Sequence, residues 1–138
     1  MEAENLQINT LHHKLAFEEE FEHSKCHIAS IAITPNNQFL FIGINDGTLK
    51  QYNLKRHNKL QKDYGRVHRD LIKTMTILPD GKILFTGSFD HHLKQWNIKY
   101  QQLIRDWTMV HTGQLRCMKL CLDSTVLVTS GGDMTIKK

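Results

Sequence analysis

The feature that most constrains this chain of 138 residues is internal repetition. Residues 35–53 and 79–97 align without a gap at an offset of 44, and nine of the nineteen positions are identical. The identical pairs are Pro35/Pro79, Leu40/Leu84, Phe41/Phe85, Gly43/Gly87, Asp46/Asp90, Leu49/Leu93, Lys50/Lys94, Gln51/Gln95 and Asn53/Asn97. A third copy follows at an offset of 43, with matches at His68/His111, Asp80/Asp123, Leu84/Leu127, Thr86/Thr129, Asp90/Asp133 and Lys94/Lys137. A period of this length indicates an array of equal units, each of which buries its hydrophobic face against a neighbour.

Each unit is predicted to form short strands separated by turns. Glutamate, a good helix former, is absent after residue 22, and Asn45–Gly47 and Leu78–Gly81 carry typical turn residues. The expected strands are Ile28–Ile33, Phe39–Ile42, Thr48–Tyr52, Lys59–Tyr64, Leu71–Ile77, Ile83–Thr86, Leu93–Ile98 and Gln102–Trp107. Four antiparallel strands in about 43 residues, stacked face to face, form the blade of an all-β propeller.

Polar and aromatic residues occur at a distinctive spacing in the second unit, where Gly87–Asp90 precedes Trp96-Asn97. This unit resembles the repeats of the WD-repeat (Trp-Asp repeat) propeller family, which has Gly-Ser-x-Asp and Trp-Asp at these places. The resemblance implies a buried structural tetrad in the second unit and three of its members in the third, namely His68, Thr86, Asp90 and Trp96, then His111, Thr129 and Asp133. The first unit departs from the pattern, because Ile42 and Tyr52 replace the family's Ser/Thr and Trp.

The repeats also divide the chain. We expect residues 1–13 to form an acidic and polar tail and residues 14–138 to form a partial propeller. The expected parts are a lone outer strand at 14–22, a first blade at 23–64, a second blade at 65–107 and a truncated third blade at 108–138. A further period after Trp96 ends at position 139, one residue past Lys138. Because a ring needs typically 4–8 blades, we expect a fragment of a longer propeller that requires the remaining blades for closure.

Some of the tetrad residues also have the types found in a hydrolase triad, since Asp90 could orient His68 and His68 could activate Thr86. We favour the structural interpretation, because a buried threonine has no access to substrate. His23 and Cys26 are capable of binding metal but lack the second, well-spaced pair of a zinc site. The sequence therefore predicts no enzyme, no metal site and no cofactor.

The cysteines and the apolar segments bear on the compartment. Three cysteines without framework spacing argue against a secreted disulfide scaffold. Cys117 and Cys121 would lie ~13 Å apart on one face of a strand, too far for a disulfide, and we expect both to be buried small hydrophobes. No apolar stretch approaches the ~20 residues of a membrane span, and no signal peptide opens the chain. We expect a soluble, cytoplasmic protein.

A basic stretch from Lys50 to Lys73 carries eight Lys and Arg residues against Asp63 and Asp70. Its central candidates are Lys55, Arg56, Lys59, Lys62 and Arg66. A solvated outer strand explains this charge most simply. The alternative is a module that binds RNA, an anionic lipid surface or an acidic protein tail, although the few interleaved aromatic residues weaken the case for RNA.

The family resemblance implies a non-catalytic scaffold for multi-protein complexes, which binds a partner peptide or domain on the propeller loops. In WD-repeat proteins, partner contacts often lie just before the turn Asp and just after the loop His. The corresponding candidates here are Asn45, Phe89, Arg69 and Leu71. Phe89 is the most informative of them, because an exposed aromatic side chain in a turn is suited to anchor an interface.

Overall fold

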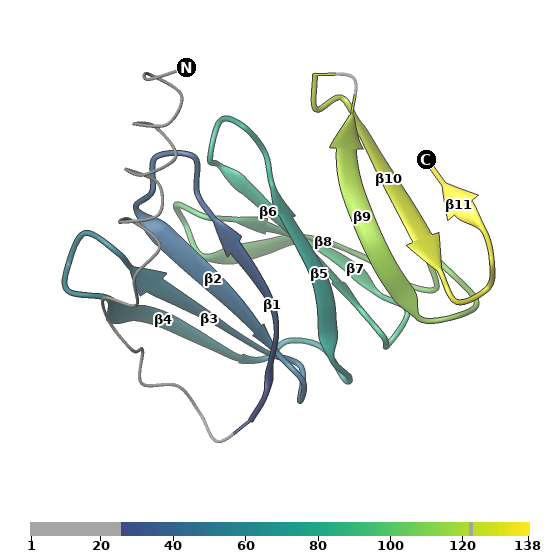
Figure 1. The fold of residues 1–138 in the computed structure, drawn as a ribbon, viewed down its shortest axis with the longest axis horizontal. Coiled ribbons are helices and arrows are strands. Elements are labelled where there is room, and N and C mark those ends of the chain that lie inside the picture. Colours follow the sequence, from purple (N-terminus) through teal and green to yellow (C-terminus); the bar gives the residue numbers. More distant parts are fainter. Residues whose placement is uncertain (1–25, 122) are drawn as a thin grey trace, which may run out of the picture.

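The structure, a computed structural model, describes residues 26–121 and 123–138 as three antiparallel β-sheets (Figure 1). The first sheet has the order β1 (Ile28–Ile33), β2 (Phe39–Ile44), β3 (Thr48–Asn53) and β4 (Lys59–Arg66). The second has the order β5 (Ile72–Ile77), β6 (Ile83–Ser88), β7 (Leu93–Asn97) and β8 (Gln102–Trp107). The third contains β9 (Leu115–Cys121), β10 (Val126–Gly131) and β11 (Ile136–Lys137). The predicted all-β class is confirmed, whereas the lone strand expected at 14–22 lies outside the described residues.

Four strands are longer than the sequence predicted, since β3 ends at Asn53, β4 ends at Arg66, and β2 and β6 also extend. β2 continues to Ile44 and β6 continues to Ser88, because the ladder of each sheet is bulged at its inner edge. The bulge lets Ile28 pair with Ile44 in the first sheet and Ile72 pair with Ser88 in the second. A bulge of this kind bends the strand and increases its twist. Alternation of apolar residues carries no signal for it.

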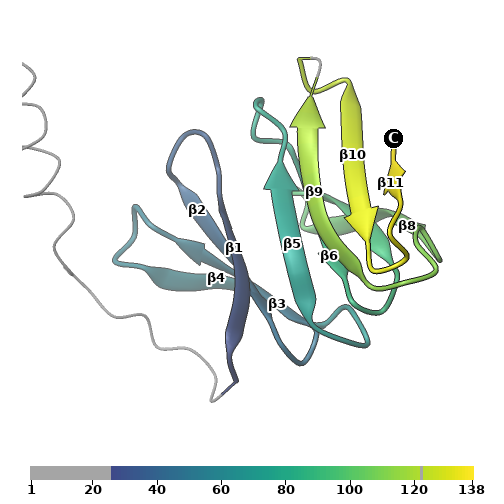
Figure 2. The same ribbon diagram turned by 45° about the vertical axis from the view of Figure 1, so that its right-hand side comes forward.

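The sheets fan out from their innermost strands, β1, β5 and β9, which lie side by side (Figures 1 and 2). Apolar side chains pack in the seam between adjacent sheets. The first seam holds Phe41, Leu49, Ile72, Leu84, Trp96 and Ile98, all buried. The second seam holds Leu93, Leu115 and Met118, with Phe85 and Trp107 packed against them. The stability of each sheet therefore depends on the apolar face of its neighbour.

A repeated glycine permits the close approach of adjacent sheets. A Cβ atom at Gly87 would lie 2.5 Å from Leu115 Cδ2 and 2.9 Å from Thr74 Cγ2. Gly43, its counterpart in β2, faces Ile72 in the same way. This contact explains why both positions of the repeat are glycine, because any side chain would push away the innermost strand of the next sheet.

The outer faces of the fan differ from the inner seams. Ile31 and Ile33 of β1 are 61% and 48% exposed, whereas their counterparts in the repeat, Met75 and Ile77, pack into the first seam. The described chain contains no helix long and apolar enough to span a membrane.

The expectation that Cys117 and Cys121 are buried was wrong, since both are exposed free thiols. Neighbouring residues of a strand face opposite sides of the sheet. Met118 points into the second seam, so Cys117 and Cys121 face the side of β9 that the second sheet does not cover.

Candidate functional site

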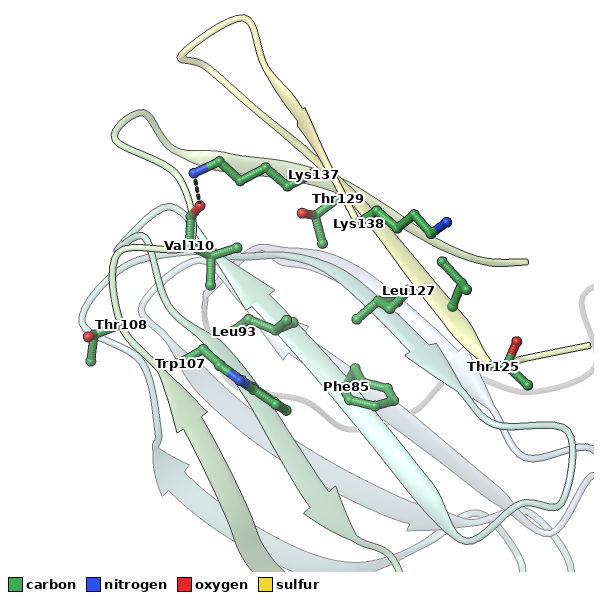
Figure 3. A pocket seen from close by; sticks show the side chains of 11 residues that line it. Phe85, Leu93, Trp107, Thr108, Val110, Thr125, Leu127, Thr129, Lys137 and Lys138 are labelled. Carbon is green, nitrogen blue, oxygen red and sulfur yellow. Dashed lines mark hydrogen bonds between the residues drawn. The ribbon is translucent and has the colours of Figure 1, made fainter. Parts of the chain in front are cut away.

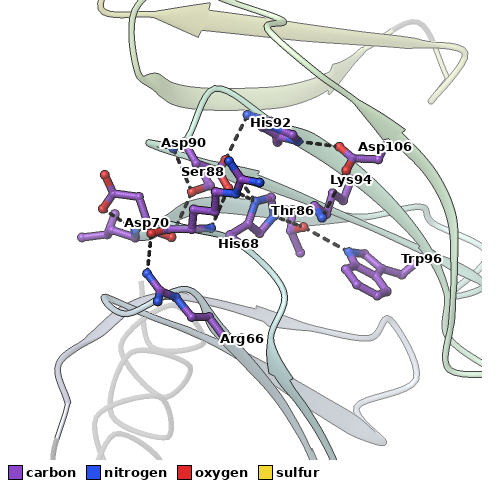
Figure 4. A network of polar contacts seen from close by, with 12 residues as sticks. Arg66, His68, Asp70, Thr86, Ser88, Asp90, His92, Lys94, Trp96 and Asp106 are labelled. Carbon is purple, nitrogen blue, oxygen red and sulfur yellow. Dashed lines mark hydrogen bonds and ion pairs between the residues drawn. The ribbon is translucent and has the colours of Figure 1, made fainter.

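A chain of hydrogen bonds links the loop before β5 to the turn after β6 (Figure 4). His68, in the β4–β5 loop, has Nδ1 3.0 Å from Asp90 Oδ2 and Nε2 2.9 Å from Thr86 Oγ1. The Trp96 indole donates to the same Thr86 hydroxyl over 3.0 Å. His68, Thr86 and Trp96 are buried. The structure thus brings together the four residues that the second repeat singled out.

The roles of the donors follow from the chemistry of the groups. Asp90 can only accept, so His68 Nδ1 carries a proton toward it. In the neutral ring Nε2 is then an acceptor, so the Thr86 hydroxyl donates to Nε2 while it accepts from Trp96. Each polar atom of this buried chain has a partner, which is the condition for a stable interior network.

Asp90 is the ionised end of this network. Burial opposes its ionisation, but the hydrogen bonds from His68 and from the Arg69 backbone N–H outweigh burial and hold the pKa of the carboxyl below its usual range. The Arg69 N–H donates over 2.8 Å and the His92 N–H over 3.0 Å. One carboxylate therefore fixes both the loop after His68 and the turn that contains His92.

The third sheet repeats this arrangement. His111 Nε2 lies 3.0 Å from Thr129 Oγ1, and His111 Nδ1 lies 3.0 Å from Asp133 Oδ1. In the first sheet the aspartate is kept as Asp46, but Ile42 stands at the position of Thr86 and packs with Ile44 and Tyr52 in a buried cluster. Apolar packing in the first sheet therefore replaces the hydrogen bond between Thr86 and Trp96 of the second sheet.

The geometry argues against nucleophilic chemistry at the second-sheet network. Thr86 is 0% exposed, and its hydroxyl is already shared by His68 and Trp96. A catalytic hydroxyl must instead face the substrate.

The residues considered for metal binding are dispersed. In the described part of the chain no three His, Cys, Asp or Glu side chains are grouped closely enough to hold a metal ion. The adjacent His91 and His92 could also bind a metal by their residue type, but His91 Nδ1 donates to the Gly113 carbonyl at 2.9 Å and His92 Nδ1 lies 2.8 Å from Asp106. His23, the proposed companion of Cys26, lies outside the described residues.

Loops of adjacent sheets brace one another. The backbone N–H groups of Val67 and His68 both donate to the Gly47 carbonyl, over 3.0 and 3.1 Å. Gly47 has φ +89°, and a Cβ there would lie 2.1 Å from the His68 carbonyl oxygen. The contact from His91 to Gly113 plays the same part between the second and third sheets. The loop ends of the three sheets therefore form one continuous surface.

Three of the four candidate partner-binding residues meet on this surface. The Phe89 N–H donates to the Leu71 carbonyl over 3.1 Å, and Arg69 follows His68 directly. Arg69 is exposed, while Leu71 and Phe89 are partly exposed. Asn45 occupies the turn of the first sheet that corresponds to the Phe89 turn, and it is exposed.

Phe89 has a neighbour that the sequence did not suggest. The Arg116 guanidinium of β9 lies over its ring, 5.5 Å from the centroid. A cation over an aromatic face is a favourable contact that also restricts the ring. Arg116 belongs to the next repeat, so only the stacking of the sheets brings the pair together.

The basic candidates follow the outer edge of the first sheet. Lys55 and Arg56 lie in the β3–β4 turn, Lys59 and Lys62 lie on β4, and all four are exposed. Arg66 ends β4 and donates to the Arg69 carbonyl over 2.6 Å. The basic edge therefore runs into the loop surface at Arg66.

A cavity of about 700 Å³ lies between the second and third sheets (Figure 3). Phe85, Leu93, Trp107 and Leu127 supply its apolar lining, and Thr129 borders it. In the first seam the corresponding place is filled by Trp96, whose ring meets Tyr64 edge to face at 5.6 Å. The cavity is thus part of the packing between sheets rather than of the loop surface.

Comparisons with known proteins identify these units. The family described as WD domain, G-beta repeat matches residues 17–53, 60–97 and 103–138. Among solved structures, the WD40 repeats of RRP9 and the structure of U3-55K each superimpose with a TM-score of 0.77 at 17% sequence identity. The match covers 83% of this chain but 36% of either neighbour, so the chain spans well under two thirds of their length. A search of the curated proteins found no significant match. WD-repeat domains generally act as non-catalytic scaffolds for protein interaction. The three matched segments span most of the sequence, and the chain belongs to the WD domain, G-beta repeat family.

Proposed function

We propose that this protein is a non-catalytic interaction scaffold that binds a partner peptide or domain on its loop surface, at Arg69, Leu71, Phe89 and Asn45. The observation that carries the proposal is the fixed position of Phe89. Its backbone is hydrogen-bonded to Leu71, and its ring is covered on one side by Arg116. An aromatic side chain that is ordered before binding loses little conformational entropy when a partner packs on it.

The network beneath the surface supports the same role. His68, Thr86 and Trp96 hold polar atoms in fixed places beneath the loops, and Asp90 ties two loop segments to them. Binding residues positioned by a rigid scaffold retain their geometry in the absence of the partner. The buried network therefore serves the surface instead of reacting itself.

We further propose that the protein works inside the cell, in the cytoplasm, as a member of a multi-protein complex. Cys26, Cys117 and Cys121 are free thiols, and unpaired thiols are typical of reducing compartments. We also propose the blade limits 23–64, 65–107 and 108–138; they follow the three sheets of the described chain except that β4 ends at Arg66, two residues past the first limit.

The test is capture of a crosslinked partner by Phe89→Ala compared with the unchanged protein. Tyr100→Ala is the matched control, because Tyr100 is an exposed aromatic residue in the turn at the opposite end of β7. We expect Phe89→Ala to lose the partner while the melting temperature is retained, and Tyr100→Ala to keep it. Equal capture by both variants would overturn the proposed binding surface.

The second candidate function is a basic module for RNA, an anionic lipid surface or an acidic protein tail. The observation that favours it is the exposure of Lys55, Arg56, Lys59 and Lys62 along one edge. Binding through such a surface falls steeply with added salt. A titration with anionic vesicles, with oligouridylate and with a polyglutamate peptide at two salt concentrations separates the three ligands.

A further inference from the structure

A second cavity, of about 600 Å³, opens on the loop surface where the first and second sheets meet. It is bordered by the end of β4, the β4–β5 loop, the β6–β7 turn and the outer strands β7 and β8. Its lining is largely polar and consists of Arg66, Val67, His68, Arg69, Asp90, His92, Lys94 and Asp106. Figure 4 shows His92, Lys94 and Asp106 on one side of the His68 ring and Arg66 on the other. No residue of this cavity other than His68 and Asp90 belongs to the tetrad.

The two carboxylates of the cavity already have their donors. Asp90 accepts from His68 and from the backbone of Arg69 and His92. Asp106 lies 2.8 Å from His92 Nδ1 and 3.2 Å from Lys94 Nζ. Burial opposes the ionisation of Asp106, but hydrogen bonds from these two side chains outweigh it and lower the pKa of the carboxyl. Both carboxylates are thus ionised, and both already accept hydrogen bonds from groups of the protein.

The arginine side chains of the cavity have N–H donors that no acceptor of the described chain uses. A guanidinium has five N–H donors and an ammonium has three. Within the described chain, the Arg69 side chain has no hydrogen-bond or ion-pair partner, and Arg66 uses one nitrogen to reach the Arg69 carbonyl. Three permanent cations face two carboxylates, so the cavity has both spare donors and excess positive charge. A ligand that accepts hydrogen bonds and carries negative charge complements both.

We propose that this cavity binds an oxyanion on an acidic segment of a partner protein, either a carboxylate of Glu or Asp or a phosphate on Ser or Thr. Arg66 and Arg69 supply the hydrogen bonds, and the planar guanidinium groups suit both anions. The inference deepens the proposed scaffold function and rests on it. Because Arg69 lies beside Leu71 and Phe89, the segment carries an apolar residue next to its acidic one.

A protein ligand fits this surface better than RNA. Recognition of single-stranded RNA relies on exposed aromatic faces on which bases stack. Tyr52 is 4% exposed, and Tyr64 packs edge to face against Trp96 and donates to Gln51 over 2.9 Å. Burial raises the pKa of Tyr64 to about 12. Both aromatic residues of the basic stretch are therefore committed to the sheet and offer no face for base stacking, and the guanidinium of Arg116 already lies over the ring of Phe89.

The test uses the full chain and fluorescein-labelled peptides in anisotropy titrations. The first peptide alternates Glu with Ser and contains one Phe, the second replaces the central Glu by phosphoserine, and the third replaces every Glu by Gln. The variant is Arg66→Gln with Arg69→Gln. The control is Lys55→Gln with Lys59→Gln, which removes the same charge from exposed sites of the same edge. Circular dichroism melting of every variant verifies that the fold is retained.

We expect the acidic and phosphorylated peptides to bind and the glutamine peptide not to bind. The arginine variant should weaken binding at least about tenfold, whereas the lysine variant should change it less than about twofold. The stronger of the two charged peptides identifies carboxylate or phosphate as the source. Equal losses of peptide affinity in both variants would show a diffuse charge effect and overturn the site. Oligouridylate is titrated in the same way, and tighter, arginine-dependent binding of it would also overturn the site.

The outcome also separates this inference from the scaffold proposal. If the arginine variant still captures the crosslinked partner and Phe89→Ala does not, the scaffold stands and the oxyanion site fails. If Phe89→Ala captures the partner normally, the proposed binding surface fails whatever the peptides do.

Discussion

Trp96 Nε1 lies 3.0 Å from Thr86 Oγ1, and this contact joins the third strand of the second sheet to the histidine of the loop above it. Thr86 links the indole to the imidazole in this network, since both rings bond to its one hydroxyl. The side chain thereby couples the apolar seam, where Trp96 packs, to the loop surface.

Thr86→Val should test this coupling. Valine has nearly the shape of threonine but cannot accept from Trp96 or donate to His68, so two buried polar atoms lose their partner. We expect the free energy of unfolding to fall by about 1–3 kcal/mol, measured by urea denaturation. Thr108→Val, at an exposed position, is the control and should have little effect. Equal stability of the two variants would contradict the role of the hydroxyl.

Asp90 should make the free energy of unfolding depend on pH. The pKa of Asp90 is lower in the folded protein than its usual value of 3.8, because hydrogen bonds from His68 and Arg69 outweigh the opposing effect of burial. A group of this kind stabilises the fold above its unfolded pKa and loses that contribution as the pH falls through the folded value. We therefore expect Asp90→Asn to destabilise the protein at neutral pH and the difference from the unchanged protein to shrink below about pH 4.

The measurement is the free energy of unfolding as a function of pH for both proteins. Asp123→Asn, at an exposed turn, serves as the control for the removal of one negative charge. A difference for Asp90→Asn that stays constant down to the acid limit would show that the carboxylate contributes no linked proton.

Much of the fold follows from the repeat alone. Alternation and turn residues located the strands, and the resemblance to WD repeats grouped His68, Thr86, Asp90 and Trp96 as a structural tetrad. The resemblance thereby implied that these side chains bond to one another, as buried polar groups must find partners. The bulges beside Ile28 and Ile72 were not predicted, because they depend on backbone pairing with the neighbouring strand.

Contacts between repeats escaped the sequence analysis. Arg116 of the third sheet stacks on Phe89 of the second, although the two residues are far apart along the chain. Nothing in a linear pattern states which strand face meets which. The exposure of Cys117 was missed for the same reason, since alternation gives two faces of a strand but not which of them a neighbouring sheet covers.

Gly47→Ala should disturb the bracing of adjacent loops. Its backbone has φ +89°, and the added Cβ would lie 2.1 Å from the His68 carbonyl oxygen. Gly65→Ala is the matched control, because Gly65 has φ +70° but no atom within 4 Å of the Cβ position. The left-handed backbone alone costs roughly 1–2 kcal/mol, so we expect both variants to be less stable and Gly47→Ala to lose clearly more in urea denaturation. Equal losses would mean that the two loops separate without cost.

The thiols should report the faces of β9 directly. Cys117 and Cys121 are exposed, whereas Cys26 is half-buried, so two thiols of the described chain should react rapidly with Ellman's reagent under native conditions and Cys26 more slowly. Cys117→Ser with Cys121→Ser should remove the fast phase and leave the melting temperature close to its original value, because neither side chain fills the second seam. Cys26→Ser, the control, should leave the fast phase intact. A fast phase that survives in the double variant would place the exposed thiol elsewhere and show that β9 presents its other face.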